Sequence, residues 1–297
     1  MTALRRHDRP HHRPGQGDPE RAEPRSRFRG QSKSRRSSGQ TGTWSWLRPS
    51  RWLPALVAFA VLVLIWKLLA DHDHFLLPQP GATGSELWNH PGLYLRNAGA
   101  TLVEALIGLG IGFGGAFVIA VVMSQIAIVE RALLPLAVAL NVTPVVAIAP
   151  ALVVAFGFGR TPKVIVTAVI VFFPALINTL VGLRSADPEV LDVLRSLDAA
   201  RWEVLWWVRL PSALPYLFAA ARVCLPLAVV GAVVAEFVAP GSSAGLGTLI
   251  TQASANSQLA RVYAAIICLA MLGVALTLLI TGIERRVLAW HPSRRAS

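Results

Sequence analysis

Charge is scarce in this sequence, and its scarcity excludes an ordinary soluble domain. Only 15% of the 297 residues are charged, whereas a typical soluble domain has about 25%. Hydrophobic residues make up 54% of the chain and gather after residue 51 in runs long enough to cross a bilayer, which takes about 20 mostly apolar residues. The composition therefore predicts an all-α membrane protein with a polar N-terminal tail.

The sequence lacks the cysteine, histidine and glycine patterns that disulfides, metal sites, membrane-embedded catalysis or nucleotide binding would require. Cys224 and Cys268 both lie inside apolar runs, so they indicate neither a disulfide framework nor a metal site. The seven histidines fall in the tail, the first loop and the C-terminus, whereas a membrane-embedded enzyme would need titratable side chains clustered in its spans. The stretch Gly157–Lys163, GFGRTPK, lacks the second glycine and the hydroxyl residue of a Walker A loop. We therefore expect no catalytic residue, metal or cofactor in this chain.

Acidic residues are outnumbered by basic ones, 16 against 28, and 13 of the basic residues lie within residues 1–51. This stretch is rich in Arg, Pro, Gly and Ser and has almost no aliphatic residues, so it cannot bury enough apolar surface to fold. Its charge has two interpretations, nucleic-acid binding and contact with an anionic lipid surface, and the adjacent apolar run favours the second. We expect a disordered basic tail over 1–51 and no nucleic-acid partner.

Six apolar runs predict six transmembrane helices within a membrane domain over residues 52–285, followed by a basic tail over 286–297. The segments 71–96 and 239–260, which are polar or rich in Gly and Ser, are expected to be loops, the first with a short amphipathic stretch around Ser85–Trp88 as an alternative. The predicted spans are Trp52–Ala70, Asn97–Ser124, Leu133–Phe156, Val164–Leu183, Leu214–Val238 and Val262–Ile283.

Orientation follows from the Lys and Arg residues of short loops, which tend to stay in the cytoplasm. With the N-terminus inside, six spans return the C-terminus to the cytoplasm. The outer loops then contain only Arg96, Arg160, Lys163 and Arg261. The cytoplasmic side contains the basic tail and Arg131, Arg184, Arg195, Arg201, Arg209, Arg285, Arg286, Arg294 and Arg295. This bias predicts that both termini and the segment Ala186–Leu214 are cytoplasmic.

Two spans contain residues that disturb a helix or let helices approach one another. The third span includes Pro135, Pro144 and Pro150, which should kink it or break it. These prolines have two interpretations, helix packing and a helix that lines a solute pathway. Gly108 and Gly112 are one turn apart in the second span, and this spacing allows a close helix approach.

Four charged residues fall inside predicted spans, where contact with lipid is costly. Lys67 lies near the end of the first span, from which its long side chain can reach the interface. Glu104 is expected to face protein or water. Arg222 either reaches the cytoplasmic face or pairs with a carboxylate, or it contributes to an anion pathway. Glu236 lies near the outer end of the fifth span, where an interfacial position and a gating role are the alternatives. The pathway candidates are thus Pro144, Pro150, Arg222 and Glu236.

The cytoplasmic segment Ala186–Leu214 is too long for a simple turn between spans. Asp187-Pro188-Glu189 is typical of a helix start, with Asp as N-cap and Pro at the first helical position. A second helix is expected from Ala200 to a break at Pro211. The segment is either an interfacial helix in the lipid headgroups or a docking element for a cytoplasmic partner. One apolar stripe of the first helix contains Val190, Val193, Leu194 and Leu197.

This segment resembles the cytoplasmic signature of ABC-importer permeases, which reads E-A-A, then Gly four residues later, then Leu-Pro. When Leu210-Pro211 is aligned with the end of that pattern, the E-A-A positions fall on Asp192, Val193 and Leu194. The glycine position falls on Asp198. Aspartate can adopt a left-handed conformation there at a cost of about 1 kcal/mol, or it can cap the second helix.

Four other stretches resemble the nitrate/sulfonate/taurine branch of the same binding-protein-dependent permeases, and the resemblance covers about residues 52–285. The stretches are FLLPQPGAT (Phe75–Thr83), the Pro144–Pro150 run, FGFGRTPKV (Phe156–Val164) and VVAEFVAPGSSAGLGTLI (Val233–Ile250).

The resemblance implies a permease subunit in a bacterial inner membrane, with two copies forming the pathway. A separate cytoplasmic ATPase would bind ATP and Mg²⁺, and an extracytoplasmic binding protein would deliver the solute. The residues that the resemblance places at the ATPase-coupling surface are Glu189, Asp192, Val193, Leu194, Arg195, Asp198, Arg201, Leu210 and Pro211.

For the solute, the resemblance implies a sulfonate, taurine or nitrate-like anion first, and a thiamine-pyrimidine precursor or another small organic solute as the alternative. A competing class is a stand-alone secondary transporter. That class would need no cytoplasmic docking element and would usually show an internal repeat, which the sequence does not show.

Overall fold

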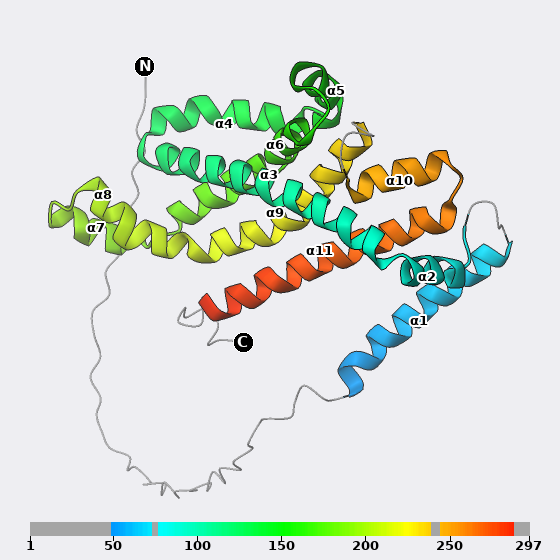
Figure 1. Cartoon of the computed structure of the whole chain (residues 1–297). Coiled ribbons are helices and arrows are strands. Elements are labelled where there is room, and N and C mark those ends of the chain that lie inside the picture. Colours follow the sequence, from blue (N-terminus) through cyan, green and yellow to red (C-terminus); the bar gives the residue numbers. More distant parts are fainter. Residues whose placement is uncertain (1–48, 73–76, 239–243, 288–297) are drawn as a thin grey trace, which may run out of the picture. The chain divides into compact units, whose positions relative to one another are not determined.

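The structure is a computed structural model that describes residues 49–72, 77–238 and 244–287. The predicted basic tails therefore lie outside the described residues, apart from residues 49–51 and 286–287. Within the described ranges every regular element is a helix, which confirms the predicted all-α class (Figure 1). In chain order the elements are α1 (Pro49–His72), α2 (Pro80–Asn89), α3 (Pro91–Gln125), α4 (Ala127–Val142), α5 (Val145–Phe156), α6 (Arg160–Arg184), α7 (Pro188–Ser196), α8 (Arg201–Val204), the π-helical turn η2 (Leu205–Arg209), α9 (Leu210–Val238), α10 (Leu246–Ala255) and α11 (Leu259–Val287).

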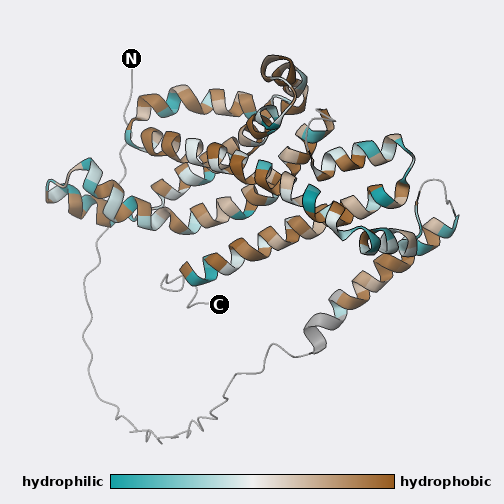
Figure 2. Cartoon of the chain, in the orientation of Figure 1, coloured by the Kyte–Doolittle hydropathy of each residue, from teal (hydrophilic) through white to brown (hydrophobic). Residues whose placement is uncertain are grey.

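Four of the described helices are long and apolar enough to cross a membrane: α3, α6, the continuous helix Arg201–Val238, and α11. The pair α4 and α5 makes a fifth if the two helices count as one broken span. The first predicted span lies within α1, which is not among the four. Apolar residues run along these helices, whereas polar residues gather on α2, α7, α8 and α10 (Figure 2).

The third predicted span is broken into two helices that meet at 90°. The break lies at Thr143 and Pro144, both of which have extended backbone angles. Proline has no N–H to continue the helix, and it disfavours a helical conformation in the residue before it. The sequence-based expectation of a kinked or broken span is therefore confirmed at Pro144, whereas α4 and α5 pass through Pro135 and Pro150 without ending.

Two segments that were expected to be loops contain helices. The loop prediction is wrong for both, although the short amphipathic stretch considered around Ser85–Trp88 does lie within a helix of the first segment. Within 71–96 lie α2 and the first turns of α3, and within 239–260 lies α10. Pro80 and Pro91 each occupy a first-turn position of their helix, where the fixed φ of proline is favourable. α10 begins after Gly245 in a stretch whose Gly and Ser content hides its helical core.

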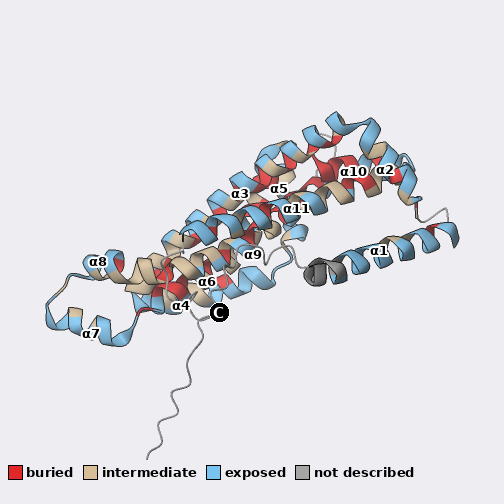
Figure 3. Ribbon diagram, turned by 90° about the horizontal axis from the view of Figure 1, so that it is seen from below, coloured by how far each residue is buried: buried red, intermediate tan, exposed pale blue. Residues whose placement is uncertain are grey.

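The core lies among α3, α6 and α9, whose inner faces are buried while their outer faces are exposed (Figure 3). Small residues, including Ala116, Ala175 and Ala228, line these inner faces. A Cβ atom at Gly112 would run into the backbone of Ala168 on α6, as the glycine spacing of α3 predicted. This close packing of backbones leaves the large aliphatic side chains of the outer faces for lipid.

Candidate functional site

The helix predicted at the start of the segment Ala186–Leu214 is confirmed. The Asp187 carboxylate accepts a hydrogen bond from the Glu189 N–H at 3.0 Å, and Pro188 is the first residue of α7. This cap satisfies one of the N–H groups that a helix start leaves without a partner.

The end of α7 shows how Asp198 occupies a position that the permease signature gives to glycine. Asp198 has φ of +53°, so it takes the left-handed conformation. Its N–H donates to the Arg195 carbonyl at 3.1 Å, and the Ala199 N–H donates to the Leu194 carbonyl at 3.1 Å. These two bonds form a Schellman motif, which closes a helix. The alternative role of Asp198 as cap of the next helix is wrong, because Ala200 is the N-cap of α8 and its N–H donates to the Glu203 carboxylate.

No break separates the second predicted helix of this segment from the apolar helix that follows it. α8, η2 and α9 form one helix from Arg201 to Val238, so the break expected at Pro211 is wrong. The turn Leu205–Arg209 is widened to π-helical geometry, and the Leu210 N–H donates to the Leu205 carbonyl. This wider turn replaces the usual backbone bond between residues four apart by one between residues five apart, just before Pro211, which has no N–H to donate. π-Helical turns are frequent at functional sites.

α7 presents two different faces. Three of the four residues of the predicted apolar stripe, Val190, Val193 and Leu197, are exposed by 44%, 59% and 71%. The fourth, Leu194, is half-buried. Leu191 and Arg195 lie on the other side of the helix and line a pocket. Asp192 and Arg195 form an exposed ion pair at 2.8 Å, and Glu189 lies exposed in the first turn.

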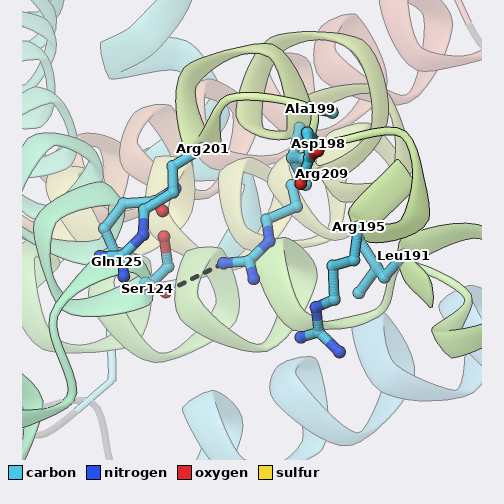
Figure 4. Close-up of a pocket in the computed structure, with 9 residues that line it drawn as sticks. Ser124, Gln125, Leu191, Arg195, Asp198, Ala199, Arg201 and Arg209 are labelled. Atoms are coloured by element: carbon cyan, nitrogen blue, oxygen red, sulfur yellow. Dashed lines mark hydrogen bonds between the residues drawn. The ribbon is translucent and has the colours of Figure 1, made fainter. Parts of the chain in front are cut away.

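A basic pocket of about 460 Å³ lies between this face of α7, the turn after it, α8, and the end of α3 (Figure 4). Arg209 donates to the Ser124 carbonyl at 2.9 Å. Its Nε and the Nε2 of Gln125 are buried and have no hydrogen-bond partner within the described residues. The pocket is lined by Ser124, Gln125, Leu191, Arg195, Asp198, Ala199, Arg201, Val204 and Arg209.

The predicted coupling residues lie in four places: the basic pocket, a neighbouring apolar pocket, the rest of α7, and the first turn of α9. Arg195, Asp198 and Arg201 come together at the basic pocket, whereas Leu210 lines a neighbouring apolar pocket with Trp202 and Trp206. Of the rest, Glu189, Asp192, Val193 and Leu194 lie along α7, and Pro211 lies in the first turn of α9. Sequence reasoning missed Ser124, Gln125 and Arg209 as pocket residues. The position of Arg209 directly before Leu210-Pro211 was a usable signal, but nothing in the sequence links residues 124–125 to this segment.

Both charged pathway candidates bond to groups of other helices, Arg222 through an ion pair and Glu236 through hydrogen bonds. Arg222 forms an ion pair with Glu284 of α11, so the expected pairing with a carboxylate is confirmed. Glu236 is fully buried, and its expected interfacial position is therefore wrong. Its carboxylate accepts hydrogen bonds from the Thr101 hydroxyl at 2.8 Å and from the N–H groups of Gly247 and Thr248 at the start of α10.

A buried charge pair lies between α3 and α6. Lys163 Nζ and Glu104 Oε1 are 3.3 Å apart, and both side chains are fully buried. Glu104 therefore faces protein, one of the two expected environments, while the loop position expected for Lys163 is wrong because this residue lies in the first turn of α6. Within the described residues no group of three His, Cys, Asp or Glu side chains could hold a metal ion.

Neither proline candidate lines the pocket that lies beside the α4–α5 bend. Pro144 forms the bend between α4 and α5. Beside this bend is a pocket of about 580 Å³ whose walls come from α4, α5, α6 and α9. Pro150 lies inside α5 and does not line it.

Comparison with known proteins places the sequence among membrane components of import systems. Residues 107–289 match the family described as "Binding-protein-dependent transport system inner membrane component". The chain is 36% identical to the riboflavin transport system permease protein RibX of Chloroflexus aurantiacus, over 82% of this chain and 92% of that protein. It is 31% identical to the formylaminopyrimidine transport permease protein ThiX of Halalkalibacterium halodurans, over 78% and 94%. It is 27% identical to the taurine transport system permease protein TauC of Escherichia coli, over 84% and 93%.

Proposed function

The chain belongs to the binding-protein-dependent transport system inner membrane component family, and from this premise we propose how it works as the permease subunit of an ABC importer. It carries a small solute across the bacterial inner membrane. A separate cytoplasmic ATPase binds ATP and Mg²⁺ and docks on α7 and α8. This chain contributes no cofactor and no catalytic residue.

The observation that carries this proposal is the uncovered apolar stripe of α7, which contains Val190, Val193 and Leu197. Burying one such side chain against a partner contributes about 1.5–3 kcal/mol. The charges of α7 favour a protein partner over lipid headgroups. The helix contains Glu189 and Asp192 against a single Arg195, whereas helices that lie on anionic membranes are rich in Lys and Arg.

The coupling residues have separate roles in this proposal. Val193 and Leu194 supply apolar contact in the ATPase groove, and Asp192 and Glu189 offer carboxylates at its rim. The basic pocket, with Arg195, Arg201 and Arg209 in its walls, accepts a carboxylate of the ATPase, because guanidinium groups match carboxylates in geometry and charge. The left-handed turn at Asp198 fixes the angle between α7 and α8, and Leu210 and Pro211 form the base of the segment.

The continuous helix Arg201–Val238 supports a mechanical route for coupling. Its first turns lie at the proposed ATPase contact and its remainder is a membrane span. Because a helix moves as a rigid element, a displacement of α8 by the ATPase would move α9 without an intervening hinge.

The proposed topology has six spans: α1, α3, the bent pair α4–α5, α6, the helix that includes α9, and α11. The distribution of Lys and Arg between loops supports cytoplasmic termini and a cytoplasmic α7. We further propose that two copies of this chain enclose the pathway and that an extracytoplasmic binding protein delivers the solute. The relatives include permeases named for taurine, riboflavin and formylaminopyrimidine, so both a sulfonate-type anion and a pyrimidine-type solute are considered.

The test of the coupling surface is co-purification of the ATPase with Val193→Asp. We expect the variant to insert into the membrane at wild-type levels and to lose the ATPase, because an aspartate cannot be buried in an apolar groove without a partner. Ile128→Asp is the matched control, since Ile128 is an exposed aliphatic residue in the first turn of α4. Retention of the ATPase by Val193→Asp at the level of this control would refute the docking assignment.

A further inference from the structure

The pocket beside the α4–α5 bend has the size of a ligand site and no charge in its walls. Its volume of about 580 Å³ falls within the range of about 300–1,000 Å³ that is typical of small-molecule sites. The polar residues in its walls are Asn141, Thr143 and Asn178, and Phe173 supplies an aromatic ring. The other lining residues are Leu140, Val145, Val146, Val169, Ile170, Pro174, Ile177 and Leu227.

The three polar side chains leave hydrogen-bonding capacity for a ligand. Asn178 donates through Nδ2 to the Pro174 carbonyl at 2.7 Å, so its own oxygen is free to accept. Thr143 donates to the Ala139 carbonyl at 2.8 Å, which leaves the lone pairs of its hydroxyl. No hydrogen bond of the Asn141 carboxamide is recorded within the described chain, so it offers a donor and an acceptor side by side.

The backbone at the bend offers another acceptor. Pro144 has no N–H, so the carbonyl of Leu140, four residues earlier, loses the donor that an unbroken helix would give it. Non-helical backbone within the membrane is tolerated only where protein covers it or where it lines a water-filled cavity. In the single chain Asn141 and Thr143 are exposed, and polar side chains facing lipid would be costly. Both costs are avoided if the pocket opens toward an aqueous pathway.

A second pocket continues the first toward α3. It has a volume of about 290 Å³ and shares Leu140, Asn141, Val169 and Phe173 with its neighbour. Its walls add Phe172. Asn141 thus lies between two pockets, with aromatic rings from α6 on the opposite wall.

The charges of the spanning helices argue against an anionic solute. Lys163 pairs with Glu104 and Arg222 pairs with Glu284, and neither cation lines this pocket. Pores that conduct anions place Arg or Lys in their walls. A sulfonate would have to give up its hydration here without a cation to replace it, which is strongly unfavourable.

We propose that this pocket is the solute-contacting site of the permease and that it takes an uncharged planar nitrogen heterocycle with amide or amino groups, such as a pyrimidine or a flavin. Asn141 pairs its carboxamide with the donor–acceptor edge of the heterocycle. Thr143 and Asn178 accept hydrogen bonds from its amino groups, and Phe173 packs against its ring. This inference rests on the proposed permease function and selects the pyrimidine-type solute over the sulfonate-type anion.

The test uses the whole transporter, reconstituted in liposomes with its ATPase and its binding protein, and measures uptake of three probes: riboflavin, formylaminopyrimidine and taurine. We expect uptake of one of the two heterocycles and none of taurine. Asn141→Leu, at equal amounts of co-purified ATPase, should lower that uptake at least tenfold. The matched control is Thr277→Val, which alters an α11 hydroxyl that bonds the Gly273 carbonyl and does not line the pocket.

The outcomes separate this inference from the proposed function. Uptake of taurine, uptake of neither heterocycle by a complex that hydrolyses ATP, or wild-type uptake by Asn141→Leu would each overturn the pocket assignment while leaving the permease role intact. Failure of the wild-type chain to co-purify with any ATPase would instead overturn the proposed function. A loss of uptake in Thr277→Val equal to that in Asn141→Leu would show a general packing effect and would also count against the pocket.

Discussion

The Glu236 carboxylate on α9 accepts a hydrogen bond of 2.8 Å from the Thr101 hydroxyl on α3, across 135 residues of sequence, and both side chains are fully buried. The same carboxylate accepts from the first N–H groups of α10. A carboxylate at a helix N-terminus is stabilised by the positive end of the helix dipole and by N–H groups that lack other partners. Glu236 therefore ties three helices together at one point.

We expect Glu236→Gln to destabilise the protein by about 2–3 kcal/mol, because the amide group would turn a donor toward N–H groups that need an acceptor. The measurement is the thermal unfolding midpoint of the purified protein in detergent. Glu189→Gln is the control, since Glu189 is an exposed carboxylate in the first turn of α7 and its loss should lower the midpoint much less. Equal midpoints for the two variants would show that the buried carboxylate adds no stability.

Gly247→Ala tests the same junction from the side of α10. A Cβ atom at Gly247 would lie 2.7 Å from Glu236 Oε2 and 2.9 Å from the Val233 carbonyl, too close for either neighbour to remain in place. We expect a lower unfolding midpoint than for the wild type. Gly273→Ala is the matched control, because nothing lies within 4 Å of the added atom in α11, and alanine stabilises an open helical position by about 0.4–1 kcal/mol. The two substitutions should therefore shift the midpoint in opposite directions.

Local features of the site could be predicted from the sequence, and long-range ones could not. The N-cap at Asp187 and the stripe of α7 follow from residue type and helical period over a few positions, and the structure bears them out. The burial of Glu236 depends on Thr101 and on α10, and neither has a sequence pattern that points to the other. The basic pocket is likewise completed by Gln125, far from α7 in the chain.

Proline correctly predicted the helix end at Pro144 and wrongly predicted one at Pro211. Pro144 ends α4 as its chemistry requires, because the residue before it is forced into an extended conformation. Pro211 does not end a helix, because the widened turn Leu205–Arg209 precedes it and the helix continues into α9. A π-turn has no recognisable sequence pattern, so the continuous link between α8 and the membrane span could be found only in the structure.

Asp198→Gly and Asp198→Val test the left-handed turn after α7. Glycine adopts φ of +53° without strain, so Asp198→Gly should keep the ATPase bound and raise the unfolding midpoint slightly. A β-branched residue is a severe outlier at positive φ, so Asp198→Val should alter the turn and lower ATPase co-purification. Binding of the ATPase to Asp198→Val as tightly as to Asp198→Gly would show that the turn geometry does not position α7.

Replacing Trp207 and Val208 by two glycines tests whether the continuous helix transmits motion from the ATPase to the membrane. Each glycine in a helix interior costs about 1 kcal/mol relative to alanine and adds backbone freedom. α7 and its exposed stripe would remain, so we expect the ATPase to co-purify and to hydrolyse ATP.

The number of solute molecules moved per ATP should fall, because a flexible joint between α8 and α9 absorbs the displacement. The same two positions changed to alanine provide the control, since this variant loses the same side chains and keeps the helix. If the glycine and alanine variants move equal solute per ATP, the rigid connection is not what couples the two processes. A defect confined to the glycine variant would assign the coupling to helix continuity, independently of which residues contact the ATPase.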